Sequence, residues 1–257
     1  MGQPFFRTFD GEMITKNTIK QITSLRQQKF RKELGLFVVE GRKMTEELLQ
    51  SEFEVEHLFA TERFLTDCPT PLARAEMVSE TQMIQMSGQD TPAGILAVVR
   101  IPKSRPLNET ASFILALDGI ANPGNMGTII RTAEWFGIND IVCSPDCVEP
   151  WNPKVIQATM GSIFRVNVLE VELPDFLQKQ NQKEKAIYGA LLEGRDIFEM
   201  TKPNSGIIVI GSESHGIRAD VLPCITHPIT IPHRNNSVTE SLNASVAAAI
   251  IMAQMTR

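Results

Sequence analysis

Short apolar runs alternate with helical patterns through the second half of the chain, and this alternation constrains the fold more than any other feature. The runs span residues 113–117, 140–143, 207–210 and 229–231. Strands that are buried on both faces of a parallel sheet have such continuous apolar sequences, and helices connect them. The sequence therefore predicts an α/β domain built on a parallel sheet.

The first hundred residues show weaker periodicity. Apolar residues at loose helical spacing predict one basic amphipathic helix from Thr18 to Lys32, ending near Gly35. A second helix is expected to run through Met44 and Leu48. Strands are expected in this half at residues 36–39, 55–59 and 95–99.

A polar stretch with prolines separates the two halves. Ile101–Asn108 contains two prolines and few apolar residues, which is typical of a linker. A chain of 257 residues is also long enough for two domains. We expect a tail at 1–13, a first domain at 14–103, a linker at 104–110 and a second domain at 111–257.

The charge is unevenly distributed along the chain. The formal net charge is −5, which disfavours a protein that coats nucleic acid. Between residues 14 and 43, however, eight Lys and Arg residues face two glutamates, a net charge of +6. This pattern predicts a local surface for a polyanion, although a solvated helix face would give the same pattern. The candidate RNA-binding residues are Lys29, Arg31, Lys32, Arg42 and Lys43.

Several classes of protein are disfavoured by the sequence. The opening residues lack the apolar core of a secretory signal, and the weakly polar run 244–255 is shorter than the roughly 20 residues of a membrane span. Cys143 and Cys147 are the only close pair among four cysteines, so no zinc motif is complete. We expect a cytoplasmic protein that binds no metal and does not enter a membrane.

The first candidate site follows the strand at 113–117. Asn125 is expected to cap a helix from about Met126 to Phe136, closed by Gly137. Arg131 should lie over Gly127, one turn earlier, which suits an RNA phosphate or ribose near the positive helix end. Alternatively, Asn125 only caps the helix and Arg131 pairs with a surface acid. The stretch matches neither a dinucleotide-binding fingerprint nor a P-loop.

The second candidate site follows the apolar run at 206–210. Gly211 and Gly216 bracket a loop in which backbone groups can approach a ligand closely. Glu213 lies between these glycines and could bond a ligand or orient Arg131. A surface turn is the alternative, and His215 is interpreted as a turn residue.

The third candidate site combines a strand at 229–232 with a helix at 241–252. Ser241 is a natural cap for this helix. Asn243, in the expected first turn, has less structural reason to be there. The helix is rich in alanine, which permits close packing against a sheet or another subunit.

Together and in this order, the three stretches resemble the motifs of the SpoU (TrmH-like) RNA methyltransferases. Residues 125–133 match Asn-x-Gly-x-x-x-Arg-Thr-Ala, and residues 211–216 match Gly-x-Glu-x-x-Gly. Ile231-Pro232 followed by residues 241–247 matches Ile-Pro and Ser-Leu-Asn-x-Ser-Val-Ala. Residues 154–164 are similar to the helix that this family places between its first two motifs.

The front end is similar to the L30e-like substrate-binding domain of the same family, most clearly at residues 31–41. The resemblance implies a C-terminal trefoil knot, an exception to the rule against knots. It also implies S-adenosylmethionine bound around Gly211, Ile231 and Leu242, and a homodimer formed through the methyltransferase domain.

The resemblance implies methylation of a ribose 2′-hydroxyl, with ribosomal RNA expected before transfer RNA. It assigns the reaction to Arg131, Asn125, Glu213, Ser241 and Asn243. One departure is the path from His233 to Glu240, which is about two residues longer than usual and has asparagine where glycine is expected. A non-catalytic RNA-binding protein and a small-molecule α/β enzyme remain the alternatives.

Overall fold

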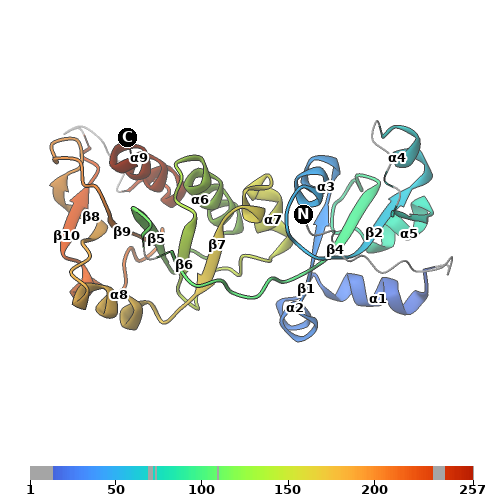
Figure 1. Ribbon diagram of the computed structural model, residues 1–257, viewed down its shortest axis with the longest axis horizontal. Coiled ribbons are helices and arrows are strands. Elements are labelled where there is room, and N and C mark those ends of the chain that lie inside the picture. Colours follow the sequence, from blue (N-terminus) through green and yellow to red (C-terminus); the bar gives the residue numbers. More distant parts are fainter. Residues whose placement is uncertain (1–13, 69–71, 73, 109, 234–240, 257) are drawn as a thin grey trace. The chain divides into compact units, whose positions relative to one another are not determined.

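The computed structural model describes residues 14–68, 72, 74–108, 110–233 and 241–256. The chain divides into two compact units (Figure 1), and each is described by itself. Unit 1 comprises Met1–Lys103 with Trp151–Phe164, and unit 2 comprises Ser104–Pro150 with Arg165–Arg257. Residues 151–164 thus pack with the first unit, whereas the division drawn from the sequence placed them in the second domain. The domain boundaries otherwise stay a prediction.

Unit 1 is built on a four-stranded sheet in the order β1-β4-β2-β3. Neighbouring strands are antiparallel except the parallel pair β2 and β3. The strands are β1 (Leu36–Glu40), β2 (Val55–Thr61), β3 (Glu76–Val78) and β4 (Ile95–Arg100). Its helices are α1 (Lys16–Ser24), α2 (Gln28–Leu34), α3 (Arg42–Leu49), α4 (Glu62–Thr66), α5 (Glu80–Met86), α7 (Pro153–Thr159) and the 3₁₀ turn η1 (Ser162–Phe164).

The prediction of a single helix at 18–32 is wrong, because the chain forms two helices, α1 and α2, with a break between them. At the break, Leu25 is fully buried and its carbonyl oxygen accepts a hydrogen bond from Arg31 Nη1 at 2.7 Å. This local side-chain contact spans the break, which the apolar spacing alone did not indicate. Gly35 ends α2 in the left-handed conformation with φ of 65°, and the helix end expected there is confirmed.

An aromatic cluster attaches residues 151–164 to unit 1. The Trp151 ring lies 5.0 Å from Phe37 and 6.1 Å from Phe53, and Phe53 meets Phe164 edge-on at 5.3 Å. In addition, Gln157 Nε2 donates to the backbone oxygen of Glu40 at 2.8 Å. These contacts come from residues about a hundred positions apart, so no local pattern predicts them.

Unit 2 contains a six-stranded sheet in the order β10-β8-β9-β5-β6-β7, with every neighbouring pair parallel. The predicted parallel sheet is confirmed. The strands are β5 (Phe113–Asp118), β6 (Asp140–Cys143), β7 (Asn167–Glu170), β8 (Ile187–Asp196), β9 (Gly206–Gly211) and β10 (His227–Thr230). β7 and β8 were not predicted, because β7 is only partly buried and β8 ends in exposed polar residues.

Helices cover both faces of this sheet (Figure 1). α8 (Leu173–Gln182) packs one face, where Leu173 and Leu177 join the core with Ile207 and Val209. α6 (Pro123–Trp135) and α9 (Ala244–Thr256) lie side by side on the other, and a 3₁₀ turn, η2 (Leu222–Cys224), lies near α8. No described helix is long and apolar enough to cross a membrane.

The expected knot depends on how the chain runs between β10 and α9. Residues 234–240, which include most of the long loop singled out in the sequence, lie outside the described residues. The knot therefore stays a prediction, as does any effect of that loop. The tail at 1–13 also lies outside the described residues.

Candidate active site

Asn122 caps α6, so the expected cap at Asn125 and the expected start near Met126 are wrong. The Asn122 side-chain oxygen accepts hydrogen bonds from the backbone N–H groups of Gly124 at 2.8 Å and Asn125 at 3.2 Å. Pro123 occupies the first helical position, where its missing N–H costs nothing. The helix thus begins three residues earlier than expected, and the side chain of Asn125 does not cap it.

The loop after β9 brings Glu213 to the carboxyl edge of the sheet. Ser212 and Gly216 exchange backbone hydrogen bonds of 3.0 and 2.9 Å, which close the loop into a tight turn. A Cβ on Gly211 would lie 2.1 Å from the Gly216 carbonyl carbon, so only glycine fits there. His215 lies in this turn as expected, and its N–H donates to Ser212 Oγ at 3.2 Å.

Asn243, not Ser241, caps α9. The Asn243 side-chain oxygen accepts from the backbone N–H groups of Ser245 at 2.9 Å and Val246 at 3.3 Å. α9 begins at Ala244, three residues later than expected, which leaves Ser241 exposed ahead of the helix. The sequence-based cap was wrong because Ser and Asn are both good caps, and tertiary contacts decide between them.

A chain of side-chain hydrogen bonds joins the three predicted stretches. Asn243 Nδ2 donates to Asn125 Oδ1 at 3.1 Å, and Asn125 Nδ2 donates in turn to Glu213 Oε1. Each residue comes from a different stretch, separated by 88 and 118 positions. The structure therefore brings these three predicted site residues into one polar cluster of unit 2, in which Glu213 and Asn243 are exposed and Asn125 is half-buried.

Arg131 lies on α6, two turns below its start, and is exposed. Among the described residues it forms no hydrogen bond or ion pair. The alternative in which Arg131 serves a surface ion pair therefore finds no support in the described part of the chain. Its guanidinium presents a planar set of donors that suits phosphate or a developing oxyanion.

The residues expected to contact a cofactor sit near the same edge of the sheet. Gly211 ends β9 and Ile231 directly follows β10, and these strands run parallel on either side of β8. Leu242, next to the capping Asn243, is 45% exposed although it is apolar. This edge of the sheet therefore has both exposed apolar side chains and the tightly packed backbone around Gly211.

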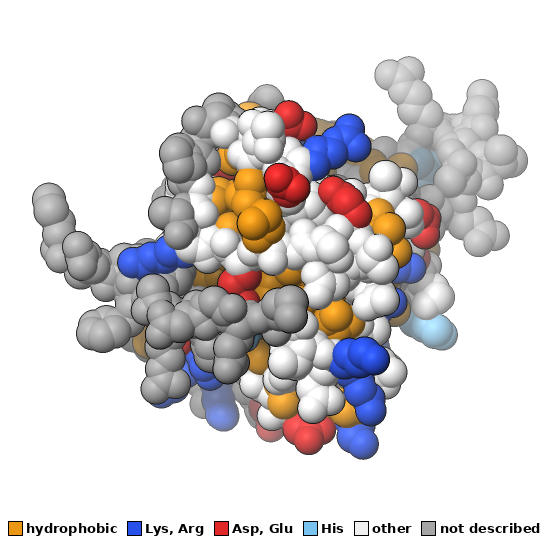
Figure 2. Space-filling view, turned by 90° about the vertical axis from the view of Figure 1, so that its right-hand side faces the viewer, with side chains coloured by type: hydrophobic (Ala, Val, Ile, Leu, Met, Phe, Trp, Pro, Cys, Tyr) orange, Lys and Arg blue, Asp and Glu red, His pale blue; other side chains and the backbone are white. Residues whose placement is uncertain are grey.

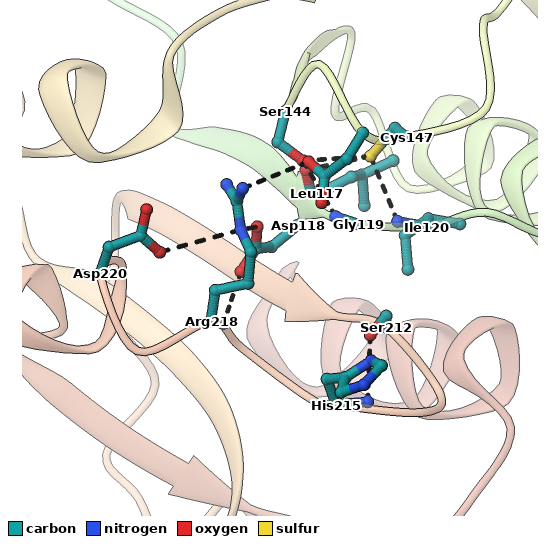
Figure 3. A network of polar contacts seen from close by, with 11 residues as sticks. Leu117, Asp118, Gly119, Ile120, Ser144, Cys147, Ser212, His215, Arg218 and Asp220 are labelled. Carbon is teal, nitrogen blue, oxygen red and sulfur yellow. Dashed lines mark hydrogen bonds and ion pairs between the residues drawn. The ribbon is translucent and has the colours of Figure 1, made fainter.

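A buried ion pair near this edge escaped the sequence-based prediction (Figure 3). Asp118, the fully buried last residue of β5, accepts from Arg218 Nε at 2.6 Å and from the Arg218 backbone N–H at 2.7 Å. Arg218 Nη1 also faces Asp146 at 3.4 Å. Burial lowers the pKa of Arg218, but the neighbouring carboxylates, Asp118 foremost, raise it overall. Only the position of Asp118 at the end of a buried strand hinted at this pair.

The candidate RNA-binding residues of unit 1 fall into two groups. Arg31 is only 2% exposed, so its side chain belongs to the interior and not to an RNA-facing surface. Arg42 is half-buried, lies 4.9 Å from the Phe64 ring and donates to the backbone oxygen of Asp67. Three lysines remain on the surface, at positions 29, 32 and 43.

Figure 2 shows one face of unit 1, on which Lys and Arg side chains alternate with acidic and apolar ones. Because Arg31 is buried and Arg42 packs on Phe64, the basic segment does not present all its charges on one surface, and the roles of its surface lysines stay a prediction.

Comparisons with known proteins agree with this arrangement. Residues 112–253 match the family model of the SpoU rRNA Methylase family, and residues 16–97 match an MRM3-like substrate binding domain. A Bacillus subtilis protein, 23S rRNA (guanosine(2553)-2′-O)-methyltransferase, is 29% identical over 94% of this chain and 96% of its own length.

Solved structures share the fold over most of the chain. A TrmH-family protein from Porphyromonas gingivalis is 35% identical, with a TM-score of 0.84 over 95% of this chain and 98% of its own. An AdoMet-bound rRNA methyltransferase from Sinorhizobium meliloti has the same fold, with a TM-score of 0.82, 24% identity and 95% coverage of both chains. With its motif residues joined at one edge of a parallel sheet, this chain belongs to the SpoU rRNA methylase family.

Proposed function

We propose that this protein methylates a ribose 2′-hydroxyl in ribosomal RNA, using S-adenosylmethionine. The chain of hydrogen bonds from Asn243 through Asn125 to Glu213 carries this proposal, because it joins three motifs that are far apart in sequence. The Bacillus subtilis relative is named for the same reaction on 23S rRNA. The tRNA alternative is an outcome of the experiment below.

The residues present fit the cofactor. A side chain on Gly211 would collide with the backbone of Gly216 and Ile217, so glycine is required for the tight turn, and the turn presents backbone groups to a ligand. The exposed apolar side chain of Leu242 and the half-buried Ile231 would hold an apolar part of the cofactor. S-adenosylmethionine, when bound, supplies a methyl group on a positively charged sulfur whose bond to that carbon breaks as the ribose oxygen attacks.

Arg131 is proposed to bind a neighbouring phosphate and to stabilise the negative charge that develops on the 2′-oxygen. An arginine is effectively always protonated in proteins, so it is poorly suited to remove the hydroxyl proton. A preorganised cation near a developing oxyanion lowers the barrier instead. In this proposal the proton passes from the 2′-oxygen to water.

The remaining predicted residues are proposed to orient the ribose. Because Asn125 donates to Glu213 and accepts from Asn243, the orientation of its side-chain amide is determined by both partners. Ser241 lies exposed two residues before Asn243 and could contribute its hydroxyl to the same surface. Holding the ribose in line for attack is worth on the order of 7 to 11 kcal/mol of the barrier.

A reaction at the 2′-hydroxyl requires RNA, and the target nucleotide must be accessible in a loop or otherwise unstacked. The MRM3-like match over residues 16–97 supports unit 1 as the part that binds substrate. The surface lysines Lys29, Lys32 and Lys43 are proposed to contact its phosphates. The cytoplasmic location expected from the sequence stays a prediction.

A homodimer is part of the proposal. α9 is apolar around its whole circumference, and Val246 on it is 47% exposed. Trp135, the last residue of the neighbouring α6, is 82% exposed. A contiguous exposed apolar patch is typical of an interface, and these two side chains on neighbouring helices support one here. Sedimentation of the purified protein is expected to give the mass of two chains.

Methyl transfer with labelled cofactor tests the proposed reaction. The purified protein is incubated with tritiated S-adenosylmethionine and with unmodified ribosomal or transfer RNA in parallel. We expect label in ribosomal RNA, at one nucleotide, on the ribose. Label in transfer RNA alone would assign the substrate to the alternative class, and label on a base would overturn ribose methylation.

The same samples separate the other hypotheses. A protein that binds both cofactor and RNA but transfers no label would be a non-catalytic family member. A protein without salt-dependent RNA affinity would be a small-molecule enzyme. Equilibrium titration of cofactor and of RNA, measured separately, distinguishes these outcomes.

A further inference from the structure

Asp118 is attached to both ends of the loop that carries Glu213. At one end, Asp118 is the sheet partner of Gly211 in the β5 and β9 pairing. At the other end, its carboxylate receives both the backbone N–H and the side-chain Nε of Arg218. Glu213 lies between these two attachments. Both ends of its loop, at Gly211 and Arg218, are therefore bonded to the same buried residue, Asp118.

The same residue leads directly into the segment that positions Asn125. After Asp118, the backbone N–H of Gly119 donates to Ser144 Oγ at 2.9 Å and that of Ile120 to Cys147 Sγ at 3.2 Å (Figure 3). The chain then reaches the cap of α6. Asp118 therefore connects the two segments whose tips meet through the hydrogen bond between Asn125 and Glu213.

The bond between Asn125 and Glu213 is exposed and does not explain by itself how the two tips stay together. Water competes for exposed polar contacts, and their net contribution is small. The ion pair of Asp118 is different, because its carboxylate is 0% exposed and a buried carboxylate needs its partners. The better-anchored part of this arrangement is thus the buried carboxylate of Asp118 with its two bonds from Arg218, whose side chain is 34% exposed.

Arg218 also extends to a third loop. Its Nη1 lies 3.4 Å from Asp146, and a Cβ on Gly119 would lie 3.2 Å from the carboxylate of the same aspartate. Gly119 has φ of +69°, which other residues rarely adopt. The half-buried guanidinium therefore contacts residues at the ends of β5 and β6 from its own loop after β9, the three strands whose ends form this part of the edge.

We infer that Arg218, held by Asp118, is a positioning residue for methyl transfer: it fixes the loop that carries Glu213 against the start of α6. This inference rests on the proposed function, because Glu213 matters only if the site performs that reaction. Arg218 touches neither the ribose nor the cofactor in this account. Its effect on turnover passes through Glu213.

The test removes both charges together, because Arg218→Met alone leaves a buried carboxylate without its partner and could unfold unit 2. In the double variant Asp118→Asn with Arg218→Met, the side-chain amide oxygen introduced at position 118 can still accept the backbone N–H of residue 218. The matched control is Glu134→Gln with Arg165→Met, which neutralises the 3.0 Å ion pair between exposed Arg165 and half-buried Glu134 in the same unit.

Two measurements are expected to respond in the double variant and not in the control. Single-turnover methyl transfer with saturating cofactor and RNA should slow about tenfold, on the scale of a lost orienting contact. Amide hydrogen exchange at residues 212–217 should speed up, while exchange in the core strands stays unchanged. The second measurement needs no substrate.

Combination with Glu213→Gln decides the route of the effect. If Arg218 acts through Glu213, the triple variant should turn over no more slowly than Glu213→Gln itself. The inference would be overturned if the slowing of turnover by the double variant and by Glu213→Gln multiplied in the triple variant. It would also be overturned if turnover and amide exchange were unchanged in the double variant. Failure of the proposed function is separate, since wild-type protein would then transfer no methyl group and exchange at 212–217 would still report on the loop.

Discussion

The predicted functional residues come together in unit 2 but are dispersed in unit 1. In unit 2, three predicted residues from distant stretches meet in one hydrogen-bonded cluster, formed by Asn125, Glu213 and Asn243. In unit 1, a compact basic segment is dispersed, with Arg31 buried and Arg42 packed on Phe64. Spaced motifs therefore predicted a shared site better than a local excess of charge predicted a surface.

The reason lies in what each pattern specifies. A polar residue at the end of a parallel strand is placed at one edge of the sheet, so several such residues converge. A charged residue in a helix can face solvent or the core, and an arginine can bury its long apolar stem and still bond a carbonyl oxygen. Four variants or sets of variants, one of them the Arg218 test above, can break or sharpen this contrast.

The largest expected effect is that of Arg131→Ala in unit 2. Loss of a preorganised cation from a developing oxyanion should lower turnover by about 10² to 10³-fold. Cofactor affinity and thermal stability should stay unchanged, because Arg131 is exposed and makes no described contact. Single-turnover kinetics and cofactor titration check this. A variant with full turnover would remove Arg131 from the site.

Arg31→Met should mainly reduce stability. The Leu25 carbonyl would lose a buried hydrogen bond from a charged donor, which costs about 2 kcal/mol. Denaturant unfolding measures this loss, and Lys29→Met on the same short helix provides the control because Lys29 is exposed. Equal stability of the two variants would contradict a structural role for Arg31.

The smallest expected effect is that of neutralising the surface lysines of unit 1. The triple variant Lys29→Ala, Lys32→Ala and Lys43→Ala should bind RNA about tenfold more weakly at low salt. The slope of log affinity against log salt should become shallower by about 2, since each lost phosphate contact contributes about 0.7. Stability should not change.

The matched control changes the same charge elsewhere. The control is the triple variant Lys179→Ala, Lys183→Ala and Lys185→Ala, whose residues lie on and just after α8 of unit 2. If this control weakens RNA binding as much as the unit 1 variant does, binding depends on net charge alone. The lysines of unit 1 would then have no special role.

Much of the fold could be predicted from the sequence. The apolar runs of β5, β6 and β9 are strands buried between helices, and burial on both faces leaves a clear apolar signal. β10 lies at the edge of the sheet and buries only Ile229, so its apolar run reports less burial. β7 and β8 lack that signal because they lie partly at the surface. The aromatic contact of Trp151 with Phe37 joins residues over a hundred positions apart, which no periodicity reports.

The sequence alone determined the parallel sheet, the family and the residues Asn125, Arg131, Glu213 and Asn243, because residue type and spacing carry these features. The tertiary structure alone decided that Asn122 and Asn243 cap the helices, that Arg31 is buried and that Asp118 binds Arg218. Alternative capping residues give a helix similar local free energies, and so do the buried and exposed placements of a long charged side chain. Contacts from distant parts of the chain select among them.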